Sequence, residues 1–420
     1  MPMIHSLGGL EILDSRGRPT VRATCVLTSG ATGIASVPSG ASTGKAEALE
    51  LRDGDPARYR GLGCRQAVGN VRGEIAAGLV GQEMADQSAL DNALIALDGT
   101  PNKARLGANA LLAVSLAFAR ACAAEAGVPL YQHFAAIHTP GKLADSLPRP
   151  TINLFSGGKH AGGQVPIQDV LVVPIGAATV DEAMAMTYAV YQAAAELTLE
   201  KYGMRALTAD EGGLAPPFPD AEAMLGDAVA AIARAGYTPG QEVSLALDVA
   251  SSHFYTDGRY HLGGEPLDSA GMIRHLVGWL ERYPIVSLED GLAEEDWANW
   301  PALRKAIGGR ALVLGDDFLC TNPARIRRAI EADAADALLL KVNQIGTLSE
   351  AAESCRIAQA AGWHVTVSAR SGETEDDWLA DLAVGWGGDH LKVGSITQSE
   401  RLAKYNRLLA IEAETVLKMG

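Results

Sequence analysis

The stretch IVSLEDGLAEEDWANWPALRKAIGGRALVLGD, residues 285–316, decides the fold of this chain. It holds two short apolar runs, IVSLE (285–289) and LVLGD (312–316), separated by helix-like sequence. Runs rich in Val, Ile and Leu are typical of strands that are buried on both faces. A parallel strand, a helix and a second strand form the repeating unit of a closed α/β barrel. The stretch therefore predicts one barrel unit, with an acidic residue at the end of each strand.

Four further runs of this kind lie in the second half of the chain. They are SLALD ending at Asp248, LLLK ending at Lys341, VTVSAR ending at Arg370 and HLK ending at Lys392. Most of the runs follow one another at a spacing of about 25 residues, as strand-plus-helix units do. Side chains at the carboxyl ends of barrel strands point into the mouth where such barrels work. We therefore expect three carboxylates, two lysines and one arginine to converge at one place.

The length and composition are those of a globular protein with two domains. One hydrophobic core seldom grows beyond roughly 250–300 residues, and this chain has 420, of which 48% are hydrophobic. Its formal net charge of −15 argues against a nucleic acid or an acidic membrane as a partner. A small anionic substrate would need a local positive field from a metal and a few Lys or Arg side chains.

The five cysteines are odd in number, far apart and free of any CxxC pair. This pattern, with no secretory signal, indicates a reduced, cytoplasmic protein with buried thiols. No stretch approaches the ~20 apolar residues that a membrane helix needs, so we expect no membrane span.

The first part of the chain reads as strands followed by helices. Residues 10–36 alternate as strands do, with a turn at 14–19, and residues 65–126 carry the apolar spacing of helices. Between them, the Gly- and Ser-rich segment Pro38–Gly44 cannot pack much and should be mobile. It is either an ordinary connection or a lid, since long polar loops often cover active sites.

The polar, Pro-bearing segment 135–150 predicts the domain boundary, with one domain at residues 1–135 and the other at 136–420. The second domain opens with TINLFSGGKHAGGQVPIQDVLVVPIGA (151–177), which reads as two strands around a Gly-rich turn. Helical sequence follows over residues 180–202.

Asp248, Glu289 and Asp316 are the candidate metal ligands. Taken singly, a carboxylate at such a place is more often a surface residue or a helix cap. Three carboxylates at one barrel mouth repel one another, however, and resist joint ionisation unless a cation lies among them. Because the set has oxygen ligands and no His or Cys, it favours Mg²⁺, Mn²⁺ or Ca²⁺ over zinc.

Lys341 and Lys392 are the candidate bases. A lysine beside a divalent cation and a second lysine has its charged form disfavoured, so its pKa should fall toward working pH. The alternative is a solvated loop lysine, but each one ends an apolar run. Glu211, in a Gly-flanked loop, could be an acid with a raised pKa. His160 could bind an anion or relay a proton, although a lone His is more often structural.

Arg370 and Ser371 supply a planar donor fork and a hydroxyl that suit a phosphate or carboxylate. The alternative is an arginine paired with Glu373 or Glu375. A divalent metal, a lysine base and an opposed carboxylic acid suit one reaction class. The base removes a proton α to a carboxylate, the metal charge stabilises the enolate-type dianion, and the acid helps a β leaving group to depart.

At this point the sequence resembles the enolase family over almost its whole length. The motifs LDSRGRPTV, VPSGASTG, LDGTPNK, LGANALLAVSLA, DEGGLAP, SLEDGL, KVNQIGTL and RSGETED occur in the enolase order. The resemblance implies an α+β N-terminal lid domain before a modified (β/α)8 barrel whose first units depart from the regular pattern. It also implies one or two Mg²⁺ per subunit and a homodimer or larger ring.

The resemblance also implies roles for residues at matching positions. Asp248, Glu289 and Asp316 match the metal ligands, and Ser39 matches the lid serine that reaches a second Mg²⁺. Lys341 matches the general base and Glu211 the general acid. The substrate-binding positions are matched by His160, Arg370, Ser371 and Lys392.

Several positions depart from the family pattern. Enolases read S-H-R-S-G-E, whereas this chain has Ala369 in place of the active-site imidazole. Enolases read Q-E, whereas this chain has Asp169, one methylene shorter, at a carboxylate that belongs near the leaving hydroxyl. Arg22 and Ala410 stand where enolase dimers usually form a Glu–Arg ion pair.

Three interpretations follow from the resemblance. In the first, the chain is an enolase that interconverts 2-phosphoglycerate and phosphoenolpyruvate. In the second, which the departures slightly favour, it is a diverged paralogue such as the enolase-like carboxyphosphonoenolpyruvate synthase of phosphinothricin-type pathways, acting on a phospho- or phosphono-substrate. In the third, it is an inactive homologue that serves as a binding protein, which the retained ligands, base and acid argue against.

Overall fold

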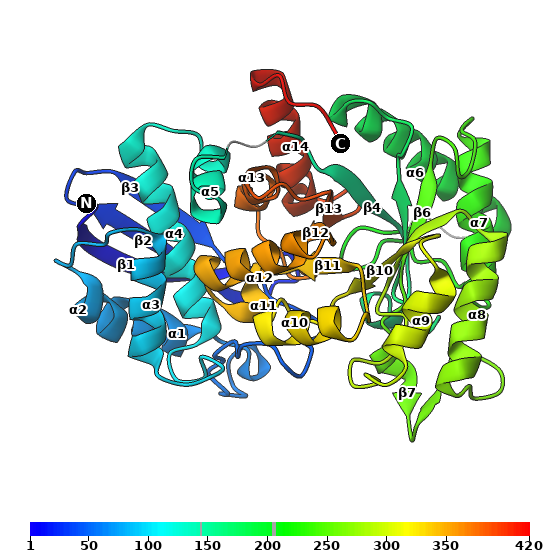
Figure 1. Ribbon diagram of the computed structural model, residues 1–420, viewed down its shortest axis with the longest axis horizontal. Coiled ribbons are helices and arrows are strands. Elements are labelled where there is room, and N and C mark those ends of the chain that lie inside the picture. The colour runs from blue at the N-terminus through cyan, green and yellow to red at the C-terminus, as the bar shows by residue number, and fades with distance from the viewer. Residues whose placement is uncertain (143–144, 204–206) are drawn as a thin grey trace.

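The computed structural model describes residues 1–142, 145–203 and 207–420. Figure 1 shows a smaller N-terminal part, in blue and cyan, beside a larger barrel that contains the rest of the chain. Residues 143–144, which belong to the segment predicted as irregular, lie outside the described residues.

The N-terminal domain is a three-stranded antiparallel sheet covered by helices. Its strands are β1 (Ile4–Leu13), β2 (Pro19–Leu27) and β3 (Thr32–Ser36). Its helices are α1 (Arg65–Asn70), α2 (Ala76–Leu79), α3 (Gln87–Asp98), α4 (Ala108–Ala126) and α5 (Leu130–His138), with short turns at Tyr59–Gly61 and Val71–Ile75. Alternation along β2 buries Val21, Ala23 and Cys25 on the core side of the strand. Strands precede helices, as the sequence predicts.

Helix α4 is the central helix of this domain and packs on β2 and β3. By length and composition it could cross a membrane, but the fold buries 78% of its most apolar window. The expectation that no stretch approaches such a length was therefore wrong for α4, which is a buried core helix. Its closeness to the sheet requires glycine, because a Cβ on Gly33 would collide with the Ala117 carbonyl oxygen.

The second domain contains eight strands that close into a barrel in the order β10, β11, β12, β13, β4, β5, β6, β9. They are β4 (Arg149–Ser156), β5 (Asp169–Val173), β6 (Ser244–Asp248), β9 (Ile285–Glu289), β10 (Leu312–Gly315), β11 (Ala337–Leu340), β12 (His364–Ser368) and β13 (His390–Gly394). Most of their residues are buried, which accounts for the continuous apolar runs. The predicted α/β fold is confirmed, and each of the six runs forms a strand.

Strand β5 runs against its neighbours. It pairs antiparallel with β4 and β6, whereas the other neighbouring pairs in the barrel are parallel. The first units therefore depart from the regular pattern, as the resemblance implies. The reversal brings the first residue of β5, Asp169, opposite Ser156 at the end of β4 and Asp248 at the end of β6.

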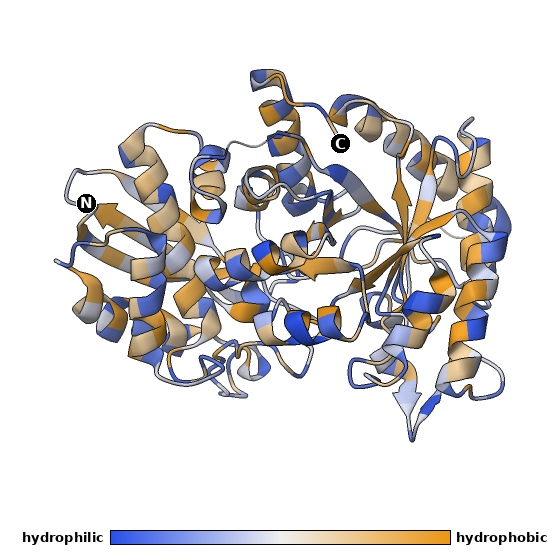
Figure 2. Ribbon diagram, viewed as in Figure 1, coloured by the Kyte–Doolittle hydropathy of each residue, from blue (hydrophilic) through white to orange (hydrophobic). Residues whose placement is uncertain are grey.

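Helices surround the barrel, with their apolar faces inward and their polar faces outward (Figure 2). They are α6 (Val180–Tyr202), α7 (Ala221–Arg234), α8 (Ser269–Arg282), α9 (Trp300–Ile307), α10 (Pro323–Glu331), the short α11 (Val342–Ile345), α12 (Leu348–Ala360), α13 (Trp378–Gly385) and α14 (Ser399–Glu414). A small hairpin, β7 (Tyr255–Thr256) with β8 (Arg259–Tyr260), extends from the barrel. The N-caps Thr179, Asp220, Asp268, Asn322 and Thr347 each accept a backbone N–H bond, which fixes where five of these helices begin.

The contact between the two domains includes α5, which packs against α13. The predicted boundary between residues 135 and 136 falls within α5. Four of the five cysteines are buried and Cys122 is partly exposed. Burial raises the pKa of the Cys25 thiol to about 12 and that of Cys64 to about 11, so both stay protonated and unreactive at neutral pH.

Candidate active site

The predicted strand-end residues meet at one mouth of the barrel, where the parallel strands present their carboxyl ends. Asp248 and Glu289 end β6 and β9, Asp316 and Lys341 follow β10 and β11, and Arg370 follows β12. Lys392 also reaches the mouth, but β13 continues to Gly394, so this lysine lies inside its strand. The six side chains are 11% exposed or less.

Two lysines form ion pairs with the three carboxylates. Nζ of Lys392 lies 2.6 Å from Glu289 Oε2 and 3.1 Å from Asp248 Oδ2. Nζ of Lys341 lies 2.6 Å from Asp316 Oδ2. Burial alone would raise the pKa of Asp248, but the two lysines outweigh it and bring the pKa to about 2. These ion pairs keep Asp248 ionised at neutral pH.

Glu289 is the carboxylate of the three whose negative charge is least favoured. Burial and the nearby charge of Asp248 raise its pKa well above the ordinary value. Its Oε1 is buried and has no hydrogen-bond partner among the described residues. A carboxylate oxygen without a partner, beside two further carboxylates, is the environment that a hard divalent cation relieves. Asp248, Glu289 and Asp316 offer oxygen ligands of the kind that such a cation prefers, although together they are not among the described groups whose ligand atoms all lie within 4.8 Å of one another.

The expected fall in the pKa of Lys341 is not found. Burial lowers this pKa, but the charge of Asp316 outweighs burial and raises it. The reason is the short ion pair between the two side chains. A cation that shared the Asp316 charge would weaken this stabilisation of the charged lysine.

Sequence reasoning missed two further carboxylates at this mouth, Asp290 and Asp317. Carboxylate oxygens of Asp290, Asp316 and Asp317 lie within 4.8 Å of one another and could hold a metal. Asp290, however, accepts the backbone N–H groups of Asp316 and Asp317, at 2.9 Å each, so it shapes the turn after β10. Burial and Asp316 raise the pKa of Asp317 to about 8. The pair of adjacent aspartates at 316–317 was the feature of the sequence that could have indicated Asp317.

A second buried cluster joins His160, Asp169 and Glu211. His160 Nδ1 lies 2.9 Å from Asp169 Oδ2, and its Nε2 lies 3.7 Å from Glu211 Oε1. Ser156 donates to the other oxygen of Asp169 at 2.7 Å, and Asn153 donates to Glu211 at 3.0 Å. Burial opposes a charge on His160, but Asp169 and Glu211 outweigh it and raise the pKa to about 9. The imidazole is therefore protonated at neutral pH.

The expected rise in the pKa of Glu211 is not found either. Burial raises this pKa, but His160, Arg401 and Lys392 outweigh burial and lower it. Asp169 differs, because burial raises its pKa against the influence of His160. The proton on this side of the site is therefore held by His160, with Glu211 as its ionised neighbour.

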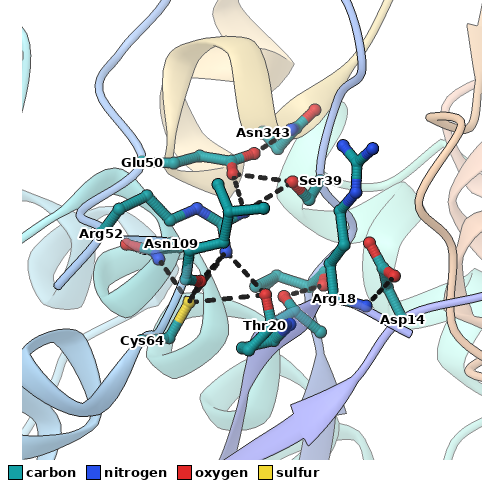
Figure 3. Close-up of polar contacts among 12 residues, drawn as sticks. Asp14, Arg18, Thr20, Ser39, Glu50, Arg52, Cys64, Asn109 and Asn343 are labelled. Atoms are coloured by element: carbon teal, nitrogen blue, oxygen red, sulfur yellow. Dashed lines mark hydrogen bonds and ion pairs between the residues drawn. The ribbon is translucent and has the colours of Figure 1, made fainter. Parts of the chain in front are cut away.

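The structure does not support Ser39 as a metal ligand. Its hydroxyl donates to Glu50 at 2.9 Å and accepts from Arg52 at 2.6 Å, as Figure 3 shows. These contacts hold it at the base of the Pro38–Gly44 segment, between the two domains. Ser42, three residues on, lines the cavity at the barrel mouth instead. The motif VPSGASTG holds both serines, and only the fold distinguishes them.

Arg370 pairs with the lid rather than with Glu373 or Glu375. Its guanidinium donates to both oxygens of Glu47, at 2.9 and 3.1 Å, and to the Ser42 carbonyl at 2.7 Å. Glu373 receives only the Arg370 backbone N–H, at 3.4 Å. Lys45 is tied as well, since its backbone N–H donates to Glu294 at 2.9 Å. The segment Pro38–Gly44 thus lies closed over the mouth as a lid, and sequence reasoning missed Glu47.

The lid covers a small cavity of about 20 Å³ at the mouth. Its wall is formed by Ala41, Ser42, His160, Gln168, Glu211, Asp248, Lys341, Ser368, Ala369, Arg370, Ser371 and Lys392. Ala369 presents only a methyl group to this space, and the Ser371 hydroxyl accepts a bond from Arg16 at 3.0 Å. A second cavity of about 270 Å³ lies deeper in the barrel, below the charged layer, and Lys392 lines both. The titratable groups gather around the smaller, upper cavity.

Two family models match this chain. One, described as "Enolase, N-terminal domain", matches residues 4–134. The other, described as "Enolase, C-terminal TIM barrel domain", matches residues 144–418. Together the two models cover both domains of the structure and nearly all of the chain.

Proposed function

Because the chain belongs to the enolase family, we propose that it is a Mg²⁺-dependent lyase acting on a phosphorylated three-carbon acid. The proposed reaction is the removal of water from 2-phosphoglycerate to give phosphoenolpyruvate. The observation that carries the proposal is the arrangement of Lys341 and Glu211 around one small cavity beside three buried carboxylates. A lysine and a carboxylate–imidazole pair that line the same cavity suit an elimination, in which one group takes a proton and another gives one.

Asp248, Glu289 and Asp316 would hold the metal. Bound Mg²⁺ would supply the positive charge that stabilises negative charge developing on the substrate carboxylate. Once it has lost its own proton, Lys341 Nζ would take the α proton, and the electron pair left on the α carbon would form the new double bond. Glu211 and the protonated His160 face the β hydroxyl, and a proton from this pair lets the hydroxyl leave as water.

Arg370, Ser371 and Lys392 would hold the anionic groups of the substrate. Arg370 and Lys392 are buried cations, for which burial opposes the charge but neighbouring carboxylates outweigh it and raise the pKa. Both therefore stay charged when the lid excludes water. A charge-assisted bond in such a site is stronger than a neutral one.

The first test is turnover of 2-phosphoglycerate by the purified protein with Mg²⁺. Phosphoenolpyruvate formation, followed by its ultraviolet absorbance, is expected, and a chelator should abolish it until Mg²⁺ is restored. Activity that persists after complete removal of divalent ions would contradict the metal assignment.

The second candidate is a diverged enolase-like synthase, such as a carboxyphosphonoenolpyruvate synthase, and it rests on the leaving-group side of the cavity. There Ala369 offers only a methyl group, and Asp169 is held by Ser156 and His160. A methyl group occupies less volume than an imidazole, which is what a different substituent on the three-carbon acid would need. Failure to turn over 2-phosphoglycerate, together with Mg²⁺-dependent binding of it, would favour this candidate. Turnover at the rate of ordinary enolases would exclude it.

A further inference from the structure

A continuous set of hydrogen bonds connects the N-terminal sheet with Arg370. Figure 3 shows the part of it that contains Arg52, Ser39, Glu50 and Asn343. It begins at Arg52, whose guanidinium donates to the Pro19 carbonyl at 2.6 Å and to the Leu62 carbonyl at 3.0 Å. The same side chain donates to Glu50 Oε2 and to the Ser39 hydroxyl, each at 2.6 Å. Arg52 thereby fixes Glu50 to the start of β2.

The two carboxylate oxygens of Glu50 accept hydrogen bonds from different parts of the chain. Oε2 accepts the Ser39 hydroxyl at 2.9 Å, which joins the start of the lid to the chain that follows it. Oε1 faces the barrel domain and accepts Nδ2 of Asn343 at 3.3 Å. Glu50 therefore contacts both domains at the base of the lid.

Asn343 connects Glu50 to the guanidinium of Arg370, which is the proposed anion-binding group. Its Oδ1 accepts NH1 of Arg370 at 3.1 Å. An amide carries its donor and its acceptor on opposite sides, so donation to Glu50 directs the amide oxygen toward Arg370. The lid tip reaches the same guanidinium through Ser42 and Glu47.

We propose that Glu50 is a positioning residue, which sets the orientation of Arg370 through Asn343 and anchors the lid through Ser39. The N-terminal domain thus tunes how tightly the barrel holds an anionic substrate. The inference deepens the proposed function and rests on it, since it assigns Arg370 to the anion. Glu50 touches neither Lys341 nor Glu211 in the described contacts, so it acts on binding more than on proton transfer.

The sharpest change is Glu50→Gln, which keeps the shape of the side chain and removes its charge. Three donors, from Ser39, Arg52 and Asn343, then face a group with one acceptor oxygen and one amide nitrogen. The amide of Asn343 can turn, and its nitrogen would then oppose Arg370, donor against donor. The matched control is Glu74→Gln, because Glu74 also pairs with an arginine, Arg105, but on the exposed side of the N-terminal domain.

In steady-state assays with 2-phosphoglycerate and Mg²⁺, Glu50→Gln should raise KM by about 10-fold or more, the size of one charge-assisted hydrogen bond. It should leave kcat within about threefold and the thermal midpoint close to that of the unaltered protein. Glu74→Gln should change neither kinetic constant. An unchanged KM for Glu50→Gln, or an equal loss in both glutamine variants, would overturn the proposal.

A double-mutant cycle with Asn343→Ala tests whether the effect of Glu50 on Arg370 depends on Asn343. If Glu50 acts through Asn343, Glu50→Gln should add little to KM in the Asn343→Ala background. If the two substitutions raise KM independently, so that their effects multiply in the double variant, Glu50 does not act through Asn343.

Calorimetric titration with inorganic phosphate separates this proposal from the proposed reaction. A protein that binds phosphate but does not turn over 2-phosphoglycerate would count against the reaction alone. In that case Glu50→Gln should still weaken phosphate binding about 10-fold, and unchanged phosphate affinity would overturn the positioning role. Absence of phosphate binding by the unaltered protein would overturn it too.

Discussion

Ala369 and Asp169 are the two residues at which we expect this site to depart from the enolase pattern. Both lie on the leaving-group side, Ala369 in the cavity wall and Asp169 paired with Ser156 and His160. The Asp169 carboxylate lies 2.9 Å from His160 Nδ1 and, with Glu211, raises the pKa of that ring. The structure brings the residues predicted for the metal, the base and the anion to the barrel mouth, except Ser39, which bonds to Glu50 and Arg52 instead.

Restoring the family residues tests whether these two positions explain any loss of enolase activity. If the protein turns over 2-phosphoglycerate slowly, Ala369→His with Asp169→Glu should raise kcat/KM by about 10-fold or more, because the pair restores a donor and a longer carboxylate. Steady-state kinetics on both single variants and the double variant provide the measurement. No gain in the double variant would mean that the pocket differs at further positions.

Lys341 is the proposed base, and we expect its substitution to lower kcat more than the other substitutions do. We expect Lys341→Ala to lower kcat by at least ~10²-fold, the contribution of a positioned proton acceptor. Lys305→Ala, on an exposed turn of α9, should leave kcat unchanged. Unchanged turnover in Lys341→Ala would show that another group removes the proton.

His160 should make stability depend on pH. Its pKa in the fold is about 9, above the ~6.5 of an unfolded histidine, so protonation stabilises the fold. This contribution is complete below about pH 6.5 and is lost as the pH rises through about 9.

Thermal unfolding of the unaltered protein and of His160→Gln between pH 6 and pH 10 provides the measurement. The difference in midpoint should be largest near pH 6 and should shrink toward pH 10. A difference that does not change with pH would contradict a charged His160.

The lid is the element on which the site depends most. Its closure needs two close approaches that only glycine allows. A Cβ on Gly40 would collide with the Arg370 guanidinium, and one on Gly44 would lie 2.5 Å from the Cys320 sulfur. The lid thus packs against side chains that follow β12 and β10, which connects the N-terminal domain to the chemistry at the barrel mouth.

Gly40→Ala should therefore hold the lid away from Arg370. We expect a loss of about 100-fold in kcat/KM, since misplacement by ~1 Å can cost that much, with little change in thermal midpoint. Gly73→Ala is the matched control, because a Cβ there meets no other atom within 4 Å. Equal kinetics in the two variants would show that the lid does not need this contact.

Association of whole molecules is the remaining expectation from the family. We expect a homodimer or larger ring, without the usual Glu–Arg pair at Arg22 and Ala410. Arg22 is exposed on β2 and lines a groove with Glu375 and Asp377. Arg22→Glu combined with Ala410→Arg should strengthen self-association in sedimentation experiments, whereas either single change should not. A protein that stays monomeric at all concentrations would contradict the expectation.

The sequence by itself determined the barrel and most of its mouth. Buried parallel strands must be apolar along their whole length, so a charged residue at the end of such a run stands out. This is why Asp248, Glu289, Asp316, Lys341 and Arg370 could be found by pattern alone. Helix α6 also has the extent expected from the helical sequence over residues 180–202.

Only the tertiary structure decided which side chains meet across long separations in the chain. The reversal of β5 puts Asp169 at the mouth, and backbone packing turns Ser39 toward Glu50 while Ser42 lines the cavity. The pKa directions of Lys341 and Glu211 also depended on partners that sequence spacing does not show. Charge interactions and hydrogen bonds act over a few ångströms in space, so their outcome is fixed by the fold and not by the order of residues.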